Sequence, residues 1–225
     1  MNPALRRWLP APGLRTIVLF AIAAVASLLF VVIADEVREG AADHFDEVTA
    51  MTVHRLDSAL GDAIAKTATF IGSNFVVGPV VILTAALAIY RRERRPAAIL
   101  ALDVAVVMIA NGVLKVYFSR QRPTLFDKIP LPKSFSFPSG HAMAAMGIYG
   151  VVAAILVALY PRARTAILIV GPVLIFMIGV SRIYLGVHWP LDVLAGFAGG
   201  VPPMVVAIYL LHRPANAPET ISRPL

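Results

Sequence analysis

The sequence predicts an all-α, polytopic membrane protein with about six transmembrane helices and an amphipathic extracytoplasmic connector. Hydrophobic residues make up 59% of the chain and the mean hydropathy is +0.79, whereas ordinary soluble domains contain about 45–50% apolar residues. These residues gather in runs of about 20, the length that a helix needs to cross a bilayer. Short arginine clusters separate the runs. We therefore expect one membrane domain over residues 1–225.

The apolar runs predict where the membrane-spanning helices lie. The first run is longer than the roughly 7–15 apolar residues of a signal peptide, so we interpret it as a retained span. The second contains Asn74, Gly78 and Pro79 and is the least regular, but such residues are tolerated where they face neighbouring helices. The expected spans are Thr16–Ala34, Thr69–Tyr90, Ala97–Val116, His141–Tyr160, Thr165–Tyr184 and Val193–Leu211.

Residues 35–66, which we call the connector, differ in kind from the apolar runs. Acidic residues alternate there with apolar ones such as Val48, Met51 and Leu60. This alternation favours amphipathic helices on or near a membrane surface. A solvated segment with helical turns explains the same pattern equally well.

Basic residues in the short loops predict the orientation, because Lys and Arg concentrate on the cytoplasmic side. They precede the first span and separate the second span from the third and the fourth from the fifth. These residues are Arg6, Arg7, Arg15, Arg91, Arg92, Arg94, Arg95, Arg162 and Arg164. We therefore expect both termini in the cytoplasm. The connector and the loops 117–140 and 185–192 should then lie on the outer side of a bacterial inner (plasma) membrane.

Two classes of function are disfavoured by composition. The chain has a net charge of +7, but its arginines sit between apolar runs, which favours a topological role over nucleic-acid binding. It contains no cysteine, so it has neither a disulfide framework nor a thiolate metal site. The loop 117–140 carries basic residues on the predicted outer side, where a phosphate ligand would explain them. They are Arg120, Arg122, Lys128 and Lys133.

The first of three polar motifs ends the third span. Lys115 and Arg122 are seven residues apart, which puts them on one face if the helix continues. Pro123 marks the expected end of that helix. Cations that extend from a helix end toward the interface are an equally good explanation of this motif alone.

The second motif, Pro138-Ser139-Gly140-His141, directly precedes the fourth span. Backbone amides around Ser139 and Gly140 are free to face an anion, and the helix that follows favours negative charge at its start. Ser139 is suited to cap that helix, with His141 at its mouth. Alone, the motif is equally typical of an ordinary capped helix with an interfacial histidine.

The third motif runs from Ser181 and Arg182 to His188 and Asp192. His188 and Asp192 are four residues apart, so a helical turn would bring them to the same side. A carboxylate bonded to one imidazole nitrogen fixes the tautomer and makes the other nitrogen more nucleophilic. A structural Asp–His pair is the alternative.

Together the motifs place three cations, two histidines, an orienting acid and a glycine-containing anion loop on one predicted membrane face. Phosphoryl transfer needs this set, because cations and amides stabilise the charge of the transferred group while histidines attack and protonate. The motifs contain no carboxylate cluster for magnesium or zinc, so we expect no metal and no cofactor. Asp103, halfway through the third span, is expected to have a buried structural role instead.

The pattern Lys-x6-Arg-Pro, Pro-Ser-Gly-His and Ser-Arg-x5-His-x3-Asp over residues 115–192 resembles the type 2 phosphatidic acid phosphatase family. The resemblance implies that His188 is the nucleophile, oriented by Asp192, and that His141 is the general acid and base. It also implies a group of phosphate ligands. These are Lys115, Arg122, Ser139, Gly140 and Arg182.

The sequence thus predicts a membrane lipid phosphatase that works through a phosphohistidine without metal. Its partners should be membrane lipids and a lipid phosphate or pyrophosphate, such as polyprenyl pyrophosphate, phosphatidate, phosphatidylglycerol phosphate or a lipid A phosphate. Nucleic acid is not an expected partner. Two alternatives remain: a lipid phosphotransferase that uses the same histidine, and a non-enzymatic transporter or binding protein for lipid phosphates.

Overall fold

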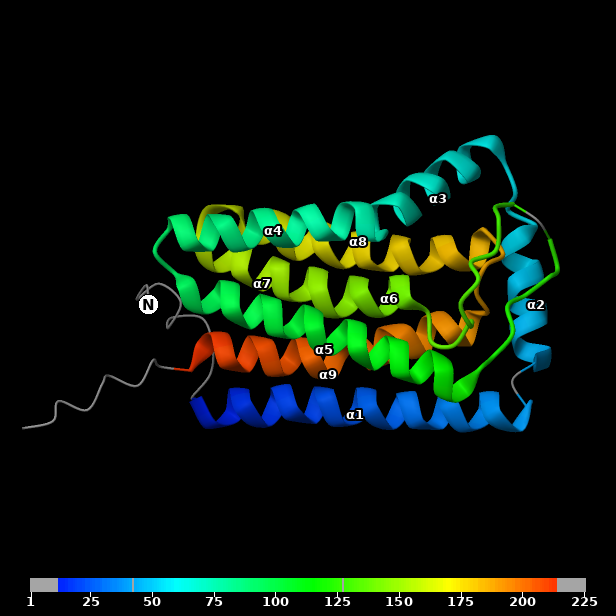
Figure 1. Cartoon of the computed structure of the whole chain (residues 1–225), viewed down its shortest axis with the longest axis horizontal. Coiled ribbons are helices and arrows are strands. Elements are labelled where there is room, and N and C mark those ends of the chain that lie inside the picture. Colours follow the sequence, from blue (N-terminus) through cyan, green and yellow to red (C-terminus); the bar gives the residue numbers. More distant parts are fainter. Residues whose placement is uncertain (1–11, 42, 127, 214–225) are drawn as a thin grey trace, which may run out of the picture.

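The computed structural model describes residues 12–41, 43–126 and 128–213, and in these ranges the chain is helical with connecting loops and no strand. Figure 1 shows the long helices side by side in one elongated bundle, with the short helix α2 across one end. The elements are α1 (Pro12–Glu39), α2 (Asp43–His54), α3 (Ala59–Ile71), α4 (Asn74–Tyr90), α5 (Arg94–Phe118), α6 (Gly140–Ala144), the π-helical turn η2 (Ala145–Tyr149), α7 (Gly150–Leu159), the 3₁₀ turn η3 (Pro161–Ala163), α8 (Arg164–Tyr184) and α9 (Pro190–His212).

The all-α membrane class is confirmed. Five helical segments are long and apolar enough to span a bilayer, and the bent pair α3 and α4 makes a sixth candidate. The start of α1 and the end of α9 lie at the same end of the bundle (Figure 1). At that end, Arg95 of α5 donates hydrogen bonds to the carbonyls of Leu210 and Arg213. Arg6, Arg7 and both chain termini lie outside the described residues.

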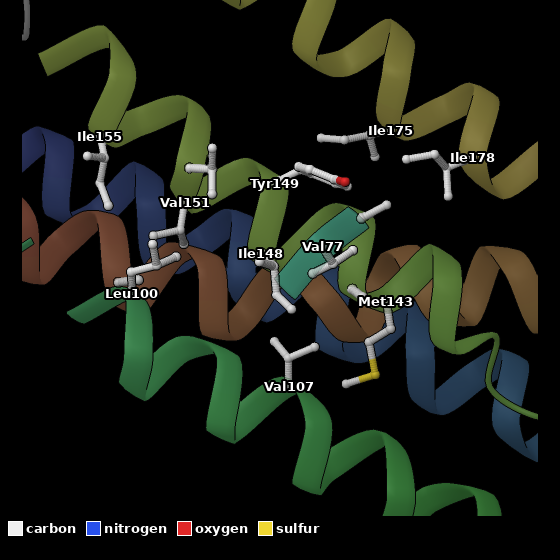
Figure 2. Close-up of a cluster of buried hydrophobic side chains, with 14 of the residues drawn as sticks. Val77, Leu100, Val107, Met143, Ile148, Tyr149, Val151, Ile155, Ile175 and Ile178 are labelled. Carbon is white, nitrogen blue, oxygen red and sulfur yellow. The ribbon is translucent and has the colours of Figure 1, made fainter. Parts of the chain in front are cut away.

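The core lies between α4, α5, η2, α7, α8 and α9. Leu100, Ile148 and Ile155 are almost fully buried in this cluster, which Figure 2 shows in close-up. By contrast, apolar side chains of α1 such as Val25 and Leu28 are more than 60% exposed. An apolar outer surface around an apolar core is what lipid contact requires, because lipid tails are as apolar as leucine.

The second predicted span, the least regular one, is bent: it begins in the last residues of α3 and continues as α4. The chain bends by 49° between α3 and α4, at Gly72 and Ser73. Tyr149 donates a hydrogen bond of 2.6 Å to the carbonyl of Ile71 at the break. That bond satisfies a carbonyl that the interrupted helix leaves free, which is a requirement for irregular backbone at membrane depth.

The connector forms the last residues of α1, all of α2 and the first part of α3. Phe45, Val48, Met51 and Leu60 are exposed on it, as the amphipathic interpretation predicts. α2 also buries a charged side chain, because Asp46 is 0% exposed. Figure 1 places α2 at the end of the bundle where α5 and α8 finish and α6 and α9 begin. The three motifs meet at this end.

Candidate active site

The first motif does not lie on one helix, contrary to the expectation that α5 continues to Pro123. α5 ends at Phe118, because Ser119 adopts a left-handed conformation with φ 47° and its hydroxyl bonds the carbonyl of Val116. Arg122 therefore lies in the loop 119–139. The two cations still converge: Lys115 donates to the carbonyl of Phe135 at 2.7 Å, and Arg122 donates to the same carbonyl at 3.1 Å.

The geometry around His188 determines which ring nitrogen carries the proton. Arg122 Nη1 lies 3.1 Å from His188 Nε2, and a guanidinium can only donate, so Nε2 must accept with its lone pair. The ring proton is then on Nδ1, which lies 3.2 Å from Asp192 Oδ2. In this tautomer the lone pair of Nε2 is held in the direction of Arg122.

Burial favours the neutral form of this ring. His188 is 2% exposed, and this burial lowers its pKa to about 3, although Asp192 opposes the shift and Arg122 adds to it. The imidazole is therefore uncharged at neutral pH. A neutral ring keeps the lone pair that a nucleophile needs.

Asp192 is held on both of its oxygens. Oδ2 accepts hydrogen bonds from the backbone N–H of Trp189 at 2.9 Å and from the hydroxyl of Ser136, and Oδ1 accepts from Arg120 at 2.9 Å. α9 begins at Pro190, with Trp189 at its N-cap and Asp192 in its first turn. The proline fits there because its missing N–H would have had no partner in the first turn.

The second motif lies against the third. Ser139 N donates to the carbonyl of Asp192 at 2.9 Å. Ser139 is at the N-cap of α6, but the expected side-chain cap is absent. Its hydroxyl is buried and makes no hydrogen bond with any residue that the structure describes. Gly196 explains the close approach, because a Cβ there would lie 2.7 Å from the carbonyl of Ser139.

Arg182 and His141 complete the group beside the break between α3 and α4. Arg182 is 4% exposed and donates from Nη1 to the hydroxyl of Thr69 in α3, while its Nε has no partner among the described residues. A Cβ on Gly72 would lie 3.1 Å from the ring of His141. Ser181 bonds the carbonyl of Ile178 in its own helix, and over the described residues its hydroxyl makes no hydrogen bond with another motif residue.

The charged residues of the three motifs are close enough to interact. The charges of Arg182 and Arg122 act on His141, and those of Arg122, Asp192 and Arg182 act on Lys115. The structure thus brings together the side chains of all the residues predicted to act, while Gly140 lies at the start of α6 with its Cα facing Asn111. The result is a group of cations around the neutral imidazole of His188, which suits a phosphoryl group.

Sequence reasoning missed three residues: Ser136, Arg120 and Asp46. Ser136 is fully buried between Asp192 and His188 Nδ1, which is 3.3 Å from its hydroxyl. The only signal was its place two residues before the second motif. Arg120 was noted as an unexplained outer cation, and its partners are Asp192 and Asp46 rather than a phosphate.

Lys128 was the second unexplained outer cation, and it too is paired with the connector. It bonds Asp57, and it bonds Asp62 at 2.8 Å. Burial by itself would lower the pKa of Lys128, but the two carboxylates raise it above its usual value. Over the described residues there is no group of three or more His, Asp or Glu placed to hold a metal ion.

Fold and site together define a class: a helical membrane protein in which an oriented histidine lies among cations suited to bind phosphate. The sequence pattern of the PAP2 superfamily matches residues 96–215, and the chain belongs to this superfamily. That match contains all three motifs and nearly all of α5.

Two curated relatives are similar in sequence. Phosphatidylglycerophosphatase B of Bacillus subtilis is 29% identical over 177 residues, which cover 77% of this chain and 87% of the relative. Undecaprenyl-diphosphatase of Sulfolobus acidocaldarius is 32% identical over 134 residues, 57% of this chain and 60% of the relative.

Two solved structures share the fold. The transmembrane PAP2-type phosphatidylglycerolphosphate phosphatase from Bacillus subtilis superposes with a TM-score of 0.76 at 28% identity, covering 82% of this chain and 93% of that one. Aquifex aeolicus LpxE superposes with a TM-score of 0.60 at 27% identity, and the superposition covers 72% of this chain and 94% of that one.

Proposed function

We propose that this chain is a membrane lipid phosphatase that hydrolyses a lipid phosphate or pyrophosphate through a phosphohistidine at His188, without a metal ion. The chain is a hydrolase of the PAP2 superfamily, and relatives named for lipid phosphatase activity cover most of its length. The observation that supports the mechanism best is the tautomer of His188. Its ring proton is on Nδ1, which faces Asp192, so that Nε2 keeps its lone pair.

In the first step, His188 Nε2 attacks phosphorus and the bond to the leaving oxygen breaks. Arg122 releases Nε2 and turns its N–H groups to the phosphoryl oxygens, together with Lys115 and Arg182. His141 gives its proton to the leaving alcohol or phosphate. The positive charge that develops on the ring of His188 is stabilised by Asp192, which is why a buried carboxylate is useful there.

In the second step, water attacks the phosphohistidine. His141, now neutral, takes a proton from that water, the N–P bond breaks, and His188 returns to its starting tautomer. The hydroxyl of Ser139 and the amide of Gly140 are placed to bind phosphoryl oxygens at the start of α6, where the helix dipole favours negative charge. Inorganic phosphate then leaves.

The substrate should be an amphiphile with its phosphate at the end of the bundle and its tail in the lipid. Phosphatidylglycerol phosphate, a polyprenyl pyrophosphate, phosphatidate and a lipid A phosphate all have this form. The apolar outer faces of α1 and α5 support such a placement. Nucleic acid has no part in this proposal, because the cations around the site are buried or partly buried rather than spread over an exposed surface.

The experiment that tests this function is phosphate release by the purified protein in detergent. We would assay a panel of lipid phosphates and pyrophosphates in EDTA, with the His188→Ala variant beside the wild type. His44→Ala is the matched control, because His44 is an exposed histidine of α2 that belongs to none of the three motifs. We expect release that survives EDTA and is lost only in His188→Ala.

The contrary outcomes are separable. Release that stops in EDTA would contradict the metal-free mechanism, and full activity of His188→Ala would contradict the nucleophile. Release that requires an added acceptor alcohol would identify a phosphotransferase. A folded protein that binds vanadate and releases no phosphate from any lipid would indicate a binding protein.

The proposed location is a bacterial inner membrane, with the site on the periplasmic face and the ends of the chain in the cytoplasm. Cysteine labelling tests this orientation on the cysteine-free background. Lys133→Cys marks the loop at the site and Arg94→Cys the opposite end of the bundle; both positions are exposed. An impermeant reagent should label only Lys133→Cys from outside the cell, and the reverse pattern would overturn the orientation.

A further inference from the structure

Arg120 connects the helix α2 with the pair formed by His188 and Asp192. Its Nη1 donates to Asp192 Oδ1 at 2.9 Å, and its Nη2 donates to Asp46 Oδ2 at 2.7 Å. The other oxygen of Asp46 accepts from the backbone N–H of Leu191 at 2.9 Å. Asp46 therefore holds both the arginine and the first turn of the helix that carries Asp192.

These three charges depend on one another. The side chains of Asp46 and Asp192 are 0% exposed and that of Arg120 is 11% exposed. The guanidinium also lies over the ring of Trp189, 5.6 Å from its centroid. A buried charge that loses its partner is strongly destabilised, so the three side chains must be placed together.

The contribution of Arg120 to Asp192 is specific to one oxygen. Oδ2 receives hydrogen bonds from Ser136, from the backbone of Trp189 and from His188. Among the described residues, Arg120 is the hydrogen-bond donor to Oδ1. Without Arg120, Oδ1 of Asp192 has no donor and the carboxylate can rotate about its Cβ–Cγ bond. That rotation moves Oδ2, the atom that accepts the hydrogen bond from His188 Nδ1.

We propose that Arg120 and Asp46 are positioning residues of the reaction, which fix the carboxylate of Asp192 and through it the attacking ring of His188. The proposal rests on the proposed function for its reaction, and it adds a task for the connector. α2 does more than lie at the membrane surface, because it supplies the buried carboxylate that anchors the arginine. Neither residue touches the phosphoryl group.

The experiment compares variants of these two residues in the full-length protein in detergent. Asp46→Asn keeps the shape of the side chain but leaves one acceptor where two donors, Arg120 and the N–H of Leu191, need one each. Arg120→Ala removes the hydrogen bonds to Asp192 and to the carboxylates of α2. Glu47→Gln is the matched control, because it makes the same change of charge one residue further along α2 at an exposed position. The measured quantities are kcat and KM for the best substrate of the lipid panel.

We expect Asp46→Asn and Arg120→Ala each to lower kcat by about 10-fold or more, as outer-shell partners of reactive groups do. KM should change by less than about 2-fold, because the phosphate ligands are untouched. The double variant should be no slower than Arg120→Ala, since neighbours in one network are not additive. Arg120→Lys keeps the charge but reaches only one carboxylate, so its kcat should lie between those of the wild type and Arg120→Ala.

Thermal unfolding of each variant separates positioning from a general defect of folding. If Asp46→Asn does not fold, the kcat of Arg120→Lys tests the proposal instead. A wild-type kcat in a folded Asp46→Asn or Arg120→Lys would overturn the proposal, as would equal losses in Asp46→Asn and Glu47→Gln. Additive losses in the double variant would contradict a shared pathway through Asp192.

Vanadate binding keeps this proposal separate from the proposed function. Vanadate bonds to the nitrogen that would attack phosphorus, so its Kd reports the placement of His188 even without turnover. We expect a weaker Kd in Asp46→Asn and an unchanged one in Glu47→Gln. If the wild type releases no phosphate from lipid and the Kd still shifts, the function fails and the positioning stands. If the wild type turns over and neither kcat nor Kd shifts, the positioning fails alone.

Discussion

His188 is surrounded by groups whose hydrogen-bonding capacities leave one arrangement of its ring proton. Arg122 is a pure donor toward Nε2, and Asp192 is an acceptor toward Nδ1. All five N–H groups of Arg122 are engaged, with His188, the hydroxyl and carbonyl of Ser134 and the carbonyls of Phe135 and Val187. To bind phosphate it must exchange some of these partners, and a phosphoryl oxygen is a stronger acceptor than a neutral carbonyl.

Replacing Asp192 by Asn should lower kcat by about 10³–10⁴-fold. The amide has one acceptor atom where the carboxylate has two, so a donor group faces either Arg120 or His188 Nδ1. The ring then changes tautomer and Nε2 loses its lone pair. Phosphate release and KM are measured beside Asp35→Asn, an exposed carboxylate of α1. A rate for Asp192→Asn near that of the wild type would remove Asp192 from the mechanism.

At this scale the sequence was informative for some residues and silent for others. His188 and Asp192 were predictable because their contact is local, four residues apart along the chain. Ser136 and Arg120 were not, because their contacts with Asp192 join residues 56 and 72 positions apart and no periodicity links them. The roles of all these residues in catalysis stay predictions until kinetics are measured.

Among the elements, the break between α3 and α4 has the most direct effect on the site. Gly72 lies where α3 turns away from the bundle, against Ile178 of α8 and His141 of α6. Hydropathy predicted one span here because it measures how apolar a segment is and carries no information on its direction. The glycine had no local signal either, since glycine is common in transmembrane helices.

Gly72→Ala should impair the enzyme through packing alone. A Cβ at this position would lie 2.4 Å from Ile178 Cγ2, and Ile178 is fully buried with a stiff, β-branched side chain. Forcing a methyl group into such packing costs about 1–3 kcal/mol, and part of the shift should reach His141. We expect a lower melting temperature and a lower kcat.

Gly171→Ala in α8 is the matched control for this change. Its Cβ would make only an ordinary contact of 3.8 Å with Ala153, so both melting temperature and kcat should stay near the wild type. Equal behaviour of the two variants would show that the break tolerates a side chain and does not constrain the site.

For the whole molecule, one buried charge stands apart from the site. Asp103 lies in α5 at 2% exposure, and neither of its carboxyl oxygens bonds a described residue. Intramembrane carboxylates are functional candidates by default, but this one has no partner through which to act on the motifs at the end of the bundle.

Asp103→Val should therefore leave kcat within about 2-fold of the wild type. It should also raise the unfolding temperature by about 2–4 °C, which corresponds to about 1 kcal/mol in a chain of this size, because an unsatisfied polar group in the interior is removed. Activity and thermal unfolding in detergent check both parts. A large loss of activity would instead place Asp103 in the reaction.

The bundle as a whole was predictable from composition, since runs of apolar residues can only be helices in lipid. The docking of α2 was not. Its acidic residues fitted an exposed segment as well as a docked one, and only the fold shows that Asp46 is buried against α9 while Asp43, three residues earlier, is mostly exposed. Long-range pairs between charges leave no trace in hydropathy.

The contacts of Asp46 with Arg120 and Leu191 have a consequence for the chain during its synthesis. They join residues 74 and 145 positions apart, and α9 is the last helix of the described residues to be made. A nascent chain that stops before Val187 lacks both His188 and Asp192, the proposed nucleophile and its orienting acid, however many helices it has inserted. Under the proposed mechanism, turnover therefore begins only when α9 docks against α2, and a partly made protein cannot dephosphorylate lipids.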